Sequence, residues 1–216
     1  MKAQSDKPLA GVILAGGAST RMGAPKAIMP WGNRTFLQAV SDKMRAAGVA
    51  PLFVVLGANY REVREHCRSC GALPIHHESW SRGQFSSLRV GVSRAPHFAS
   101  EFYFGASKPA LVTGVMVAFI DQPHIQQEVF CEIAGVSRQF PDKLIIPSCK
   151  GRRGHPFIIP CPLWPALKVM PVSATTREFL RTYETEQLLV PVSDDGIHFD
   201  LDTPEDLLLA KARYQI

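Results

Sequence analysis

Residues 9–26 read LAGVILAGGASTRMGAPK and decide the fold. The first six residues are an apolar run, and an uninterrupted run of this length is typical of a strand buried on both faces of a parallel sheet. The Gly16-Gly17 pair that follows allows backbone conformations that aim several N–H groups into one concavity, which is how a loop binds phosphate. Arg21 and Lys26 add two positive charges. The segment predicts a strand and a triphosphate-binding loop, and the alternative is a glycine turn with solvent-facing cations.

The glycine spacing excludes two common nucleotide motifs. It is neither the P-loop pattern G-x-x-x-x-G-K-[ST] nor the dinucleotide pattern G-x-G-x-x-G. A phosphate-binding loop of another kind is therefore expected.

Further apolar runs alternate with helical patterns along the whole chain. Strands are expected at 52–56, 115–120, 144–146, 157–159 and 188–192, and helices at 36–48, 61–70, 85–95, 126–139 and from 204 onward. Thr35 and Thr203 are the expected N-caps of the first and last helices. Strands that alternate with helices and are apolar on both faces predict an α/β fold with three layers, α/β/α, and a mostly parallel sheet. Residues 1–216 are expected to form a single domain.

The composition limits the class of protein. The chain has 216 residues, 46% of them hydrophobic, and its 24 Lys+Arg against 19 Asp+Glu give a net charge of +5. The basic residues are spread out, without the clusters typical of nucleic-acid binding, so an anionic small substrate is expected. Five cysteines in a chain this long do not indicate a disulfide framework. The first eight residues are polar, and no apolar run approaches the roughly 18 residues that span a bilayer. We expect a cytoplasmic protein without membrane contact.

Carboxylates follow two later segments of the predicted sheet. Asp121 ends the apolar run 115–120, at the sheet edge where ligands bind in such folds. Asp200 and Asp202 are two residues apart, so in an extended chain their side chains share a face. Carboxylate oxygens are preferred ligands of Mg²⁺, so the three aspartates predict a metal site. Turn or capping roles are the alternative.

Two other segments carry candidate binding groups. Residues 80–91, WSRGQFSSLRVG, place Ser86 and Ser87 near a helix N-terminus, where hydroxyls and free N–H groups meet a base or ribose. Residues 151–156, GRRGHP, offer two arginines and His155 to a phosphorylated acceptor. Simple capping and a solvated turn are the respective alternatives. The sequence assigns no role to residues 97–108.

The ordered motifs LAGGASTRMGAPK, SSLRVG, DQP, GRRGHP and DLDTPEDL lie within residues 11 to 212. This set resembles the molybdenum cofactor nucleotidyltransferase family, the MobA/MocA-like NTP transferases. The combination of WSRGQFSSLR with RRGHP is more similar to the cytidylyltransferase branch than to the guanylyltransferase branch. The resemblance implies a Rossmann-like nucleotidyltransferase fold, with an NTP bound by residues 9–125 and the acceptor by residues 126–216.

The resemblance also implies roles for individual residues. The nucleotide would be held by Leu14, Ala15, Gly16, Gly17, Gly23, Ser86 and Ser87. Arg21, Lys26 and Asp121 would be catalytic, with the two cations on the phosphates. Asp121 would bind Mg²⁺ together with Asp200 or Asp202, and Arg153 and His155 would contact the acceptor.

The implied activity is the transfer of a nucleoside monophosphate from an NTP, with CTP favoured, to a phosphorylated acceptor such as molybdopterin, with release of pyrophosphate. A guanylyltransferase for the same cofactor and a sugar- or polyol-phosphate nucleotidyltransferase are the alternatives within this class. A nucleotide-binding maturation protein without turnover, which delivers cofactor to a molybdoenzyme or its chaperone, is the alternative from another class.

Overall fold

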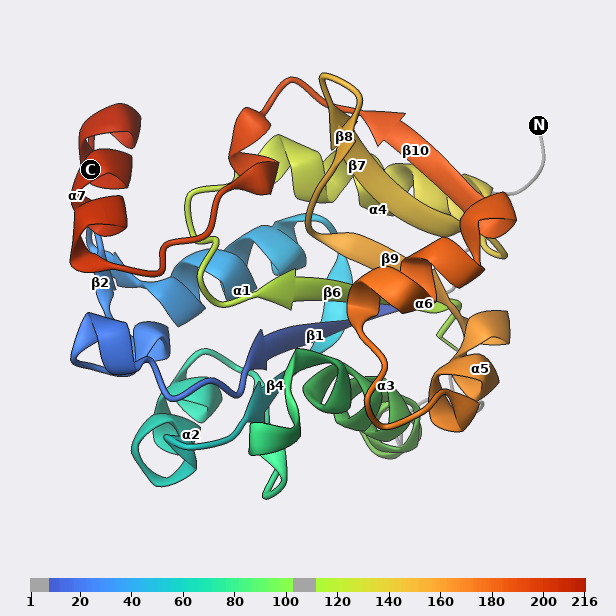
Figure 1. Cartoon of the computed structure of the whole chain (residues 1–216), viewed down its shortest axis with the longest axis horizontal. Helices are drawn as coiled ribbons and strands as arrows, with labels where there is room; N and C mark the ends of the chain where they lie inside the picture. The colour runs from blue at the N-terminus through green and yellow to red at the C-terminus, as the bar shows by residue number, and fades with distance from the viewer. Residues whose placement is uncertain (1–7, 103–111) are drawn as a thin grey trace.

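In the computed structural model of the chain, residues 8–102 and 112–216 are described, with the backbone alone for residues 95–102. Eight strands within these ranges form one sheet (Figure 1). They are β1 (Leu9–Ala15), β4 (Val49–Leu56), β5 (Leu73–His76), β6 (Gly114–Phe119), β7 (Leu144–Cys149), β8 (Arg152–Arg153), β9 (Phe157–Pro160) and β10 (Gln187–Pro191). Two more short strands, β2 (Pro30–Trp31) and β3 (Arg34–Thr35), form a separate antiparallel pair.

The strand order across the large sheet is β10-β7-β9-β6-β1-β4-β5, with β8 paired to β7. β1 runs parallel to β4 and to β6, β4 runs parallel to β5, and β7 runs parallel to β10. β9 is antiparallel to both of its neighbours, β6 and β7, and β8 is antiparallel to β7. The prediction of a mostly parallel sheet is therefore confirmed.

Helices and short 3₁₀ turns connect these strands. The helices are α1 (Phe36–Ala46), α2 (Tyr60–Ser69), α3 (Gln84–Phe102), α4 (Gln127–Gln139), α5 (Trp164–Val169), α6 (Thr176–Thr182) and α7 (Pro204–Tyr214). The 3₁₀ turns are η1 (Thr20–Met22), η2 (Lys26–Ile28), η3 (Trp80–Arg82), η4 (Cys161–Leu163), η5 (Glu184–Glu186) and η6 (Asp195–His198). No helix of the described ranges is both long enough and apolar enough to span a bilayer.

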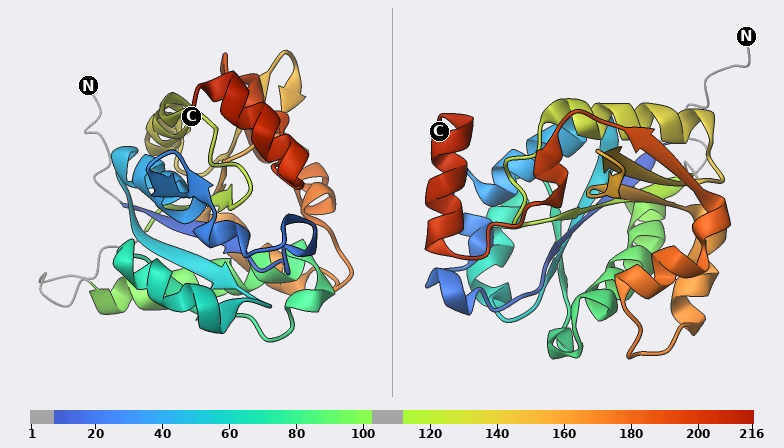
Figure 2. Two further views of the ribbon diagram at one scale, coloured as in Figure 1. Left: turned by 90° about the vertical axis from the view of Figure 1, so that its left-hand side faces the viewer. Right: turned by 45° about the horizontal axis from the view of Figure 1, so that its top comes forward.

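Successive side chains of β1 pack on opposite faces of the sheet. Ile13 belongs to the apolar cluster formed with α1, α2 and α4, whereas Val12 belongs to the cluster formed with α3, α5 and α6. Figure 2 shows helices on both sides of the sheet. Because both faces are covered, the central strands are apolar at nearly every position. The predicted three-layer arrangement is confirmed.

Reciprocal hydrogen bonds at the predicted N-caps fix the starts of α1 and α7. Thr35 Oγ1 accepts from the N–H of Gln38, whose side-chain oxygen accepts from the N–H of Thr35 at 2.7 Å. Thr203 and Asp206 make the same exchange at the start of α7. Such capping boxes satisfy N–H groups that have no partner within the helix. The second box ends the extended segment that carries Asp200 and Asp202.

Several elements differ from the sequence-based expectation. α3 runs from Gln84 to Phe102 rather than from 85 to 95, so the unassigned stretch 97–108 is helical as far as Phe102, and the remainder lies outside the described residues. The predictions omitted β5, which is a short edge strand containing Pro74, because proline weakens a strand signal. They also omitted α5 and α6, which have six and seven residues and are too short for a clear helical period.

Candidate active site

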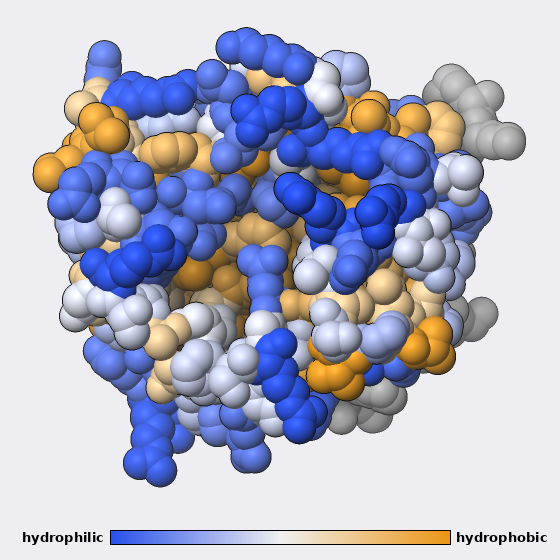
Figure 3. Space-filling view, viewed as in Figure 1, coloured by the Kyte–Doolittle hydropathy of each residue, from blue (hydrophilic) through white to orange (hydrophobic). Residues whose placement is uncertain are grey.

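A cavity of about 450 Å³ opens beside the carboxyl ends of β1 and β6. Figure 3 views the molecule onto this side and shows a central hollow with apolar colour inside and hydrophilic side chains around it. The cavity lining includes Leu14, Ala15, Gly16, Gly17, Arg21, Lys26, Ser87, Asp121 and Asp202. These residues come from segments far apart in the sequence, and all nine are among the predicted site residues.

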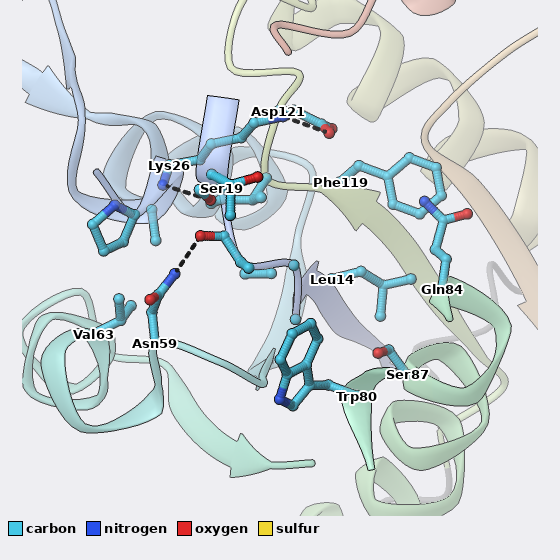
Figure 4. Close-up of a pocket in the computed structure, with 18 of the residues that line it drawn as sticks. Leu14, Ser19, Lys26, Asn59, Val63, Trp80, Gln84, Ser87, Phe119 and Asp121 are labelled. Carbon is cyan, nitrogen blue, oxygen red and sulfur yellow. Dashed lines mark hydrogen bonds and ion pairs between the residues drawn. The ribbon is translucent and has the colours of Figure 1, made fainter. Parts of the chain in front are cut away.

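The loop after β1 is held in shape by its own polar groups and by neighbours. The N–H of Lys26 donates to Ser19 Oγ at 3.2 Å. The amide of Asn59 donates to the carbonyl of Ala18 at 3.5 Å, as Figure 4 shows. Gly16 lies close to the start of α3, because a Cβ built on it would be 3.0 Å from Ser87 Oγ. The absence of a side chain at Gly16 therefore lets this loop pass close to α3.

Lys26 is the centre of a group of four charged side chains. Its Nζ lies 2.6 Å from Asp202 Oδ1 and 3.3 Å from Asp121 Oδ2. Arg21 Nη2 lies 2.9 Å from the other oxygen of Asp202. The side chain of Lys26 is 10% exposed, whereas that of Arg21 is 65% exposed. The structure thus brings together the side chains at 21, 26, 121 and 202, which lie up to 181 residues apart along the chain.

The carboxylates of the site have different electrostatic environments. Burial raises the pKa of Asp121, and the nearby ammonium of Lys26 opposes that rise. The hydrogen bond from Lys26 lowers the pKa of Asp202, with a further contribution from Arg21. The pKa of Asp200 is raised to about 6. Desolvation is the largest cause, although the residue is still exposed to solvent, and the negative charges of Asp121 and Asp202 raise the pKa further. A cation added to this site would favour the ionised forms of Asp121 and Asp200.

A row of hydrogen bonds explains why the aspartate segments meet. The N–H of Leu201 donates to the carbonyl of Asp121 at 2.9 Å. The side chain of Gln122 donates to Asp200 Oδ1, also at 2.9 Å. Farther from the cavity, His124 Nε2 lies 3.0 Å from the carbonyl of Gly196. These contacts join the segment after β6 to the segment before α7.

Asp121 carries the feature that best fits a divalent cation. Its Oδ1 is buried and has no hydrogen-bond partner in the described part of the chain, and a buried carboxylate oxygen without a partner is unfavourable unless a cation binds it. Both oxygens of Asp202 already contact cations. Among the described residues, no three His, Cys, Asp or Glu side chains form a ready metal cluster. At the cavity, Asp121 therefore has an available oxygen, whereas Asp202 would first have to exchange an ion pair, and the predicted metal residue Asp200 is outside the described lining.

Two predicted nucleotide-binding residues do not line the cavity. Ser86 Oγ donates to the carbonyl of Gly83 at 2.7 Å and lies 2.9 Å from His77 Nε2, so it faces the interior beneath α3, while Ser87 lines the cavity. Gly23 has a φ of +72° and ends η1. It is outside the described lining and allows the chain to turn toward Lys26. Consecutive helical residues point about 100° apart, which is why Ser86 and Ser87 face different surroundings.

The two predicted acceptor residues occupy different positions. Arg153 Nη2 pairs with Glu184 Oε1 at 2.5 Å on the surface, and it is not part of the cavity lining. The ring of His155 packs against Phe119, with centroids 4.2 Å apart, and Phe119 lines the cavity. Burial lowers the pKa of His155 to about 4, so its imidazole is neutral near pH 7. Of the two, His155 is the residue near the cavity.

The sequence-based prediction missed several residues that line the cavity. Trp80, Gln84 and Asn59 contribute side chains to it, and Figure 4 shows them with Phe119 around the open space. Trp80 and Gln84 lie in the predicted segment 80–91, so their position was a usable signal. Asn59 follows β4, another strand whose carboxyl end reaches this edge, and no motif marks it.

Comparisons with known proteins identify the family. The family model described as the MobA-like NTP transferase domain matches residues 11–188. The chain belongs to the MobA-like NTP transferase family.

Relatives of this MobA-like transferase carry different names. The chain is 30% identical over 209 residues to the nicotine blue oxidoreductase of Paenarthrobacter nicotinovorans, covering 91% of this chain and 93% of that protein. It is 27% identical over 206 residues to the molybdenum cofactor cytidylyltransferase of Escherichia coli (strain K12), covering 94% and 95%. A probable molybdenum cofactor guanylyltransferase of Bacillus cytotoxicus is 29% identical over 150 residues, which cover 68% of this chain and 65% of that protein. The MobA-like transferase is thus related to both nucleotidyltransferase types.

Solved structures share the fold of the MobA-like transferase. That of Rv0371c from Mycobacterium tuberculosis H37Rv superposes with a TM-score of 0.73 at 22% identity, covering 94% of this chain and 97% of that chain. Its complex with manganese superposes with a TM-score of 0.69 at 23% identity over the same shares of the two chains. The likeness confirms the Rossmann-like nucleotidyltransferase fold.

Proposed function

We propose that this MobA-like transferase moves a nucleoside monophosphate from an NTP, with CTP favoured, to molybdopterin, and releases pyrophosphate. The observation that carries the proposal is the position of Lys26, which bridges Asp121 and Asp202 at the cavity beside β1 and β6. Cations and carboxylates at one cavity suit phosphoryl transfer, where positioning and charge stabilisation supply most of the catalysis.

The residues of the cavity have distinct roles in this proposal. An oxygen of the acceptor phosphate attacks the α-phosphorus, the bond from that phosphorus to the bridging oxygen of the β-phosphate breaks, and pyrophosphate leaves with the electron pair. Arg21 and Lys26 stabilise the negative charge on the leaving group. Leu14, Ala15, Gly16, Gly17 and Ser87 position the nucleotide. His155 packs against Phe119, which lines the cavity, and would contact the acceptor on that side of the cavity.

Mg²⁺ is the proposed cofactor, held by Asp121 with Asp200 or Asp202. It would supply charge neutralisation at the phosphate oxygens. The unpartnered Oδ1 of Asp121 supports this assignment. A manganese complex of the structurally similar mycobacterial protein is consistent with binding of a divalent ion in this fold.

The preference for CTP rests on the relatives. The cytidylyltransferase match extends over 95% of that protein, whereas the guanylyltransferase match extends over 65%. A sugar- or polyol-phosphate acceptor and a nucleotide-binding maturation role without turnover are the competing proposals. An oxidoreductase is a further candidate, because the relative with that name is 30% identical over nearly its full length.

The test is release of pyrophosphate from each of the four NTPs, with molybdopterin and Mg²⁺ present and with each component omitted in turn. We expect release with CTP only when all three components are present, and a loss of at least about a thousandfold in Asp121→Asn, since one metal-binding charge is removed. Asp142→Asn, an exposed carboxylate outside the cavity lining, is the matched control. Release with GTP alone would make the protein a guanylyltransferase.

Two further assays separate the remaining candidates. NTP binding without pyrophosphate release from any acceptor would favour the maturation role. Consumption of NADH or NADPH with nicotine blue, together with no pyrophosphate release, would favour the oxidoreductase.

Full activity of Asp121→Asn would remove Asp121 from the mechanism.

A further inference from the structure

A second hollow, of about 290 Å³, lies between the β7–β8 turn, η6 and the last turn of α7. Its lining consists of Lys150, Arg152, Asp195, His198, Phe199 and Arg213. None of these residues lines the cavity described above. In Figure 1 the β7–β8 hairpin is at the top of the molecule, whereas α2 and the loop after β1 are in the lower half.

Positive charge predominates in this hollow. Three permanent cations line it, and Asp195 is the single carboxylate among the described lining residues. Asp195 pairs with Arg213 and lies 3.7 Å from Lys150. The hydrogen bond from Arg213 lowers the pKa of Asp195. One carboxylate thus orients two cations toward the same space without neutralising all of the charge.

Arg152 is the cation without an internal partner. Its guanidinium has no hydrogen bond or ion pair with any residue of the described ranges, and His198 Nε2 lies 2.9 Å from its carbonyl. The neighbouring Arg153 pairs with Glu184, because adjacent strand residues point to opposite faces. A guanidinium presents a planar fork that matches two oxygens of a phosphate.

The turn that carries Lys150 is built in an uncommon way. Cys149 and Arg152 face each other across the β7–β8 pair, and the two residues between them have φ values of +51° and +75°. Turns of this kind favour Asn or Asp before Gly, because other side chains rarely adopt positive φ. Backbone preference therefore does not explain a lysine at position 150, and its charge faces the hollow.

From these observations we propose that the hollow is a second anion-binding site, which takes the phosphate or pyrophosphate group of a small phosphorylated ligand. Arg152 binds the anion through its free guanidinium. Lys150 and Arg213, which both pair with Asp195, add their positive charges to the same anion. The ring of Phe199, 37% exposed, supplies an apolar wall for the rest of the ligand. Because Phe199 immediately precedes Asp200, the bound anion lies next to the segment that carries Asp200 and the cavity-lining Asp202.

The test is calorimetric titration with inorganic pyrophosphate, in the absence of divalent metal and at low salt. Pyrophosphate also suits the active-site cavity, so two classes of site are expected in the unmodified protein. Arg152→Glu should weaken one class at least tenfold, and Arg21→Glu should weaken the other. Binding at the proposed site should also fall as salt rises, since it depends on charge.

Matched variants make the result decisive. Arg177→Glu makes the same charge change at an exposed residue of α6 outside both cavities, and we expect it to leave both classes of site within about twofold. Arg152→Lys keeps the charge but loses the fork, so an intermediate affinity is expected. The proposal is overturned by unchanged binding in Arg152→Glu, or by an equal loss in Arg177→Glu. None of these readouts requires turnover, so the result is independent of the proposed activity.

Discussion

The side-chain amide of Gln122 donates a 2.9 Å hydrogen bond to Asp200 Oδ1 and thereby joins the end of β6 to the segment before α7. Gln122 itself is 2% exposed. An amide held in the interior at this point fixes the segment of Asp200 relative to that of Asp121 and is outside the described cavity lining. We expect Gln122 to act as a positioning residue, a role that the DQP motif alone does not predict.

Replacing this amide tests its positioning role. Gln122→Leu keeps a similar volume but removes the donor, so Asp200 loses a partner that favours its ionised form. We expect kcat to fall about tenfold, equivalent to roughly 1.4 kcal/mol in the barrier, with the KM for the NTP within twofold. Steady-state pyrophosphate release measures both quantities. Gln139→Leu, at the exposed end of α4, is the control, and an unchanged kcat in Gln122→Leu would contradict the role.

The two cations of the site should differ in their effect on stability. Lys26→Met leaves two carboxylates near a buried position without their shared ammonium, and breaking such an arrangement costs about 3 kcal/mol. Arg21→Ala removes an exposed partner, so we expect less than about 1 kcal/mol. Urea unfolding at pH 7.5 measures both values, and equal losses would show that burial of Lys26 does not matter.

Gly57 determines how closely the loop after β1 approaches η3. A Cβ at this position would lie 2.3 Å from the carbonyl oxygen of Gly16 and 2.5 Å from Trp80. Gly57→Ala should therefore cost about 1–3 kcal/mol through overpacking and weaken NTP binding, because both contacted residues line the cavity. Gly135→Ala on α4 meets nothing within 4 Å and should stabilise the helix by about 0.5–1 kcal/mol. Unfolding curves and equilibrium NTP titrations on both variants test the contrast.

Acid should destabilise the fold through His124. Burial lowers the pKa of this histidine from 6.5 to about 4, so the unfolded chain binds a proton more readily than the folded one between these values. Stability is therefore lost as the pH falls through this window, by about 2 kcal/mol from pH 7.5 to pH 5 for this residue. His124→Gln should flatten the pH dependence, and His155 should leave part of it because its pKa is lowered in the same direction. Urea unfolding at pH 7.5, 6 and 5 gives the slope, and a slope unchanged in His124→Gln would exclude this source.

The sequence predicted the parts of the fold that depend on local physics. Apolar runs such as 115–120 and capping residues such as Thr203 are signals within one segment, and both are found as expected. The edge strand β5 and the short helices α5 and α6 depend on packing against distant residues. Their own sequences are too short to show a period, and they were missed.

The same limit applies to the site. Arg21, Lys26 and Asp121 follow strands, so the geometry of a parallel sheet predicts that they share an edge. The different orientations of Ser86 and Ser87 depend on the rotation of α3, and the pairing of Arg153 with Glu184 depends on η5. Rotations and pairings of this kind arise from tertiary packing. The single-domain boundary and the catalytic roles stay predictions.

The reversed direction of β9 has a consequence for where reactive groups can be encoded. In a uniformly parallel sheet, only residues that come after a strand reach the functional rim. Because β9 points the opposite way from β6, with Phe157 beside Val117, the residues ahead of it arrive at that rim instead, and His155 meets Phe119 there. One antiparallel strand thus brings an additional segment, the one that precedes β9, to this edge of the sheet. The sequence of that segment can vary while the loops that follow the parallel strands stay unchanged.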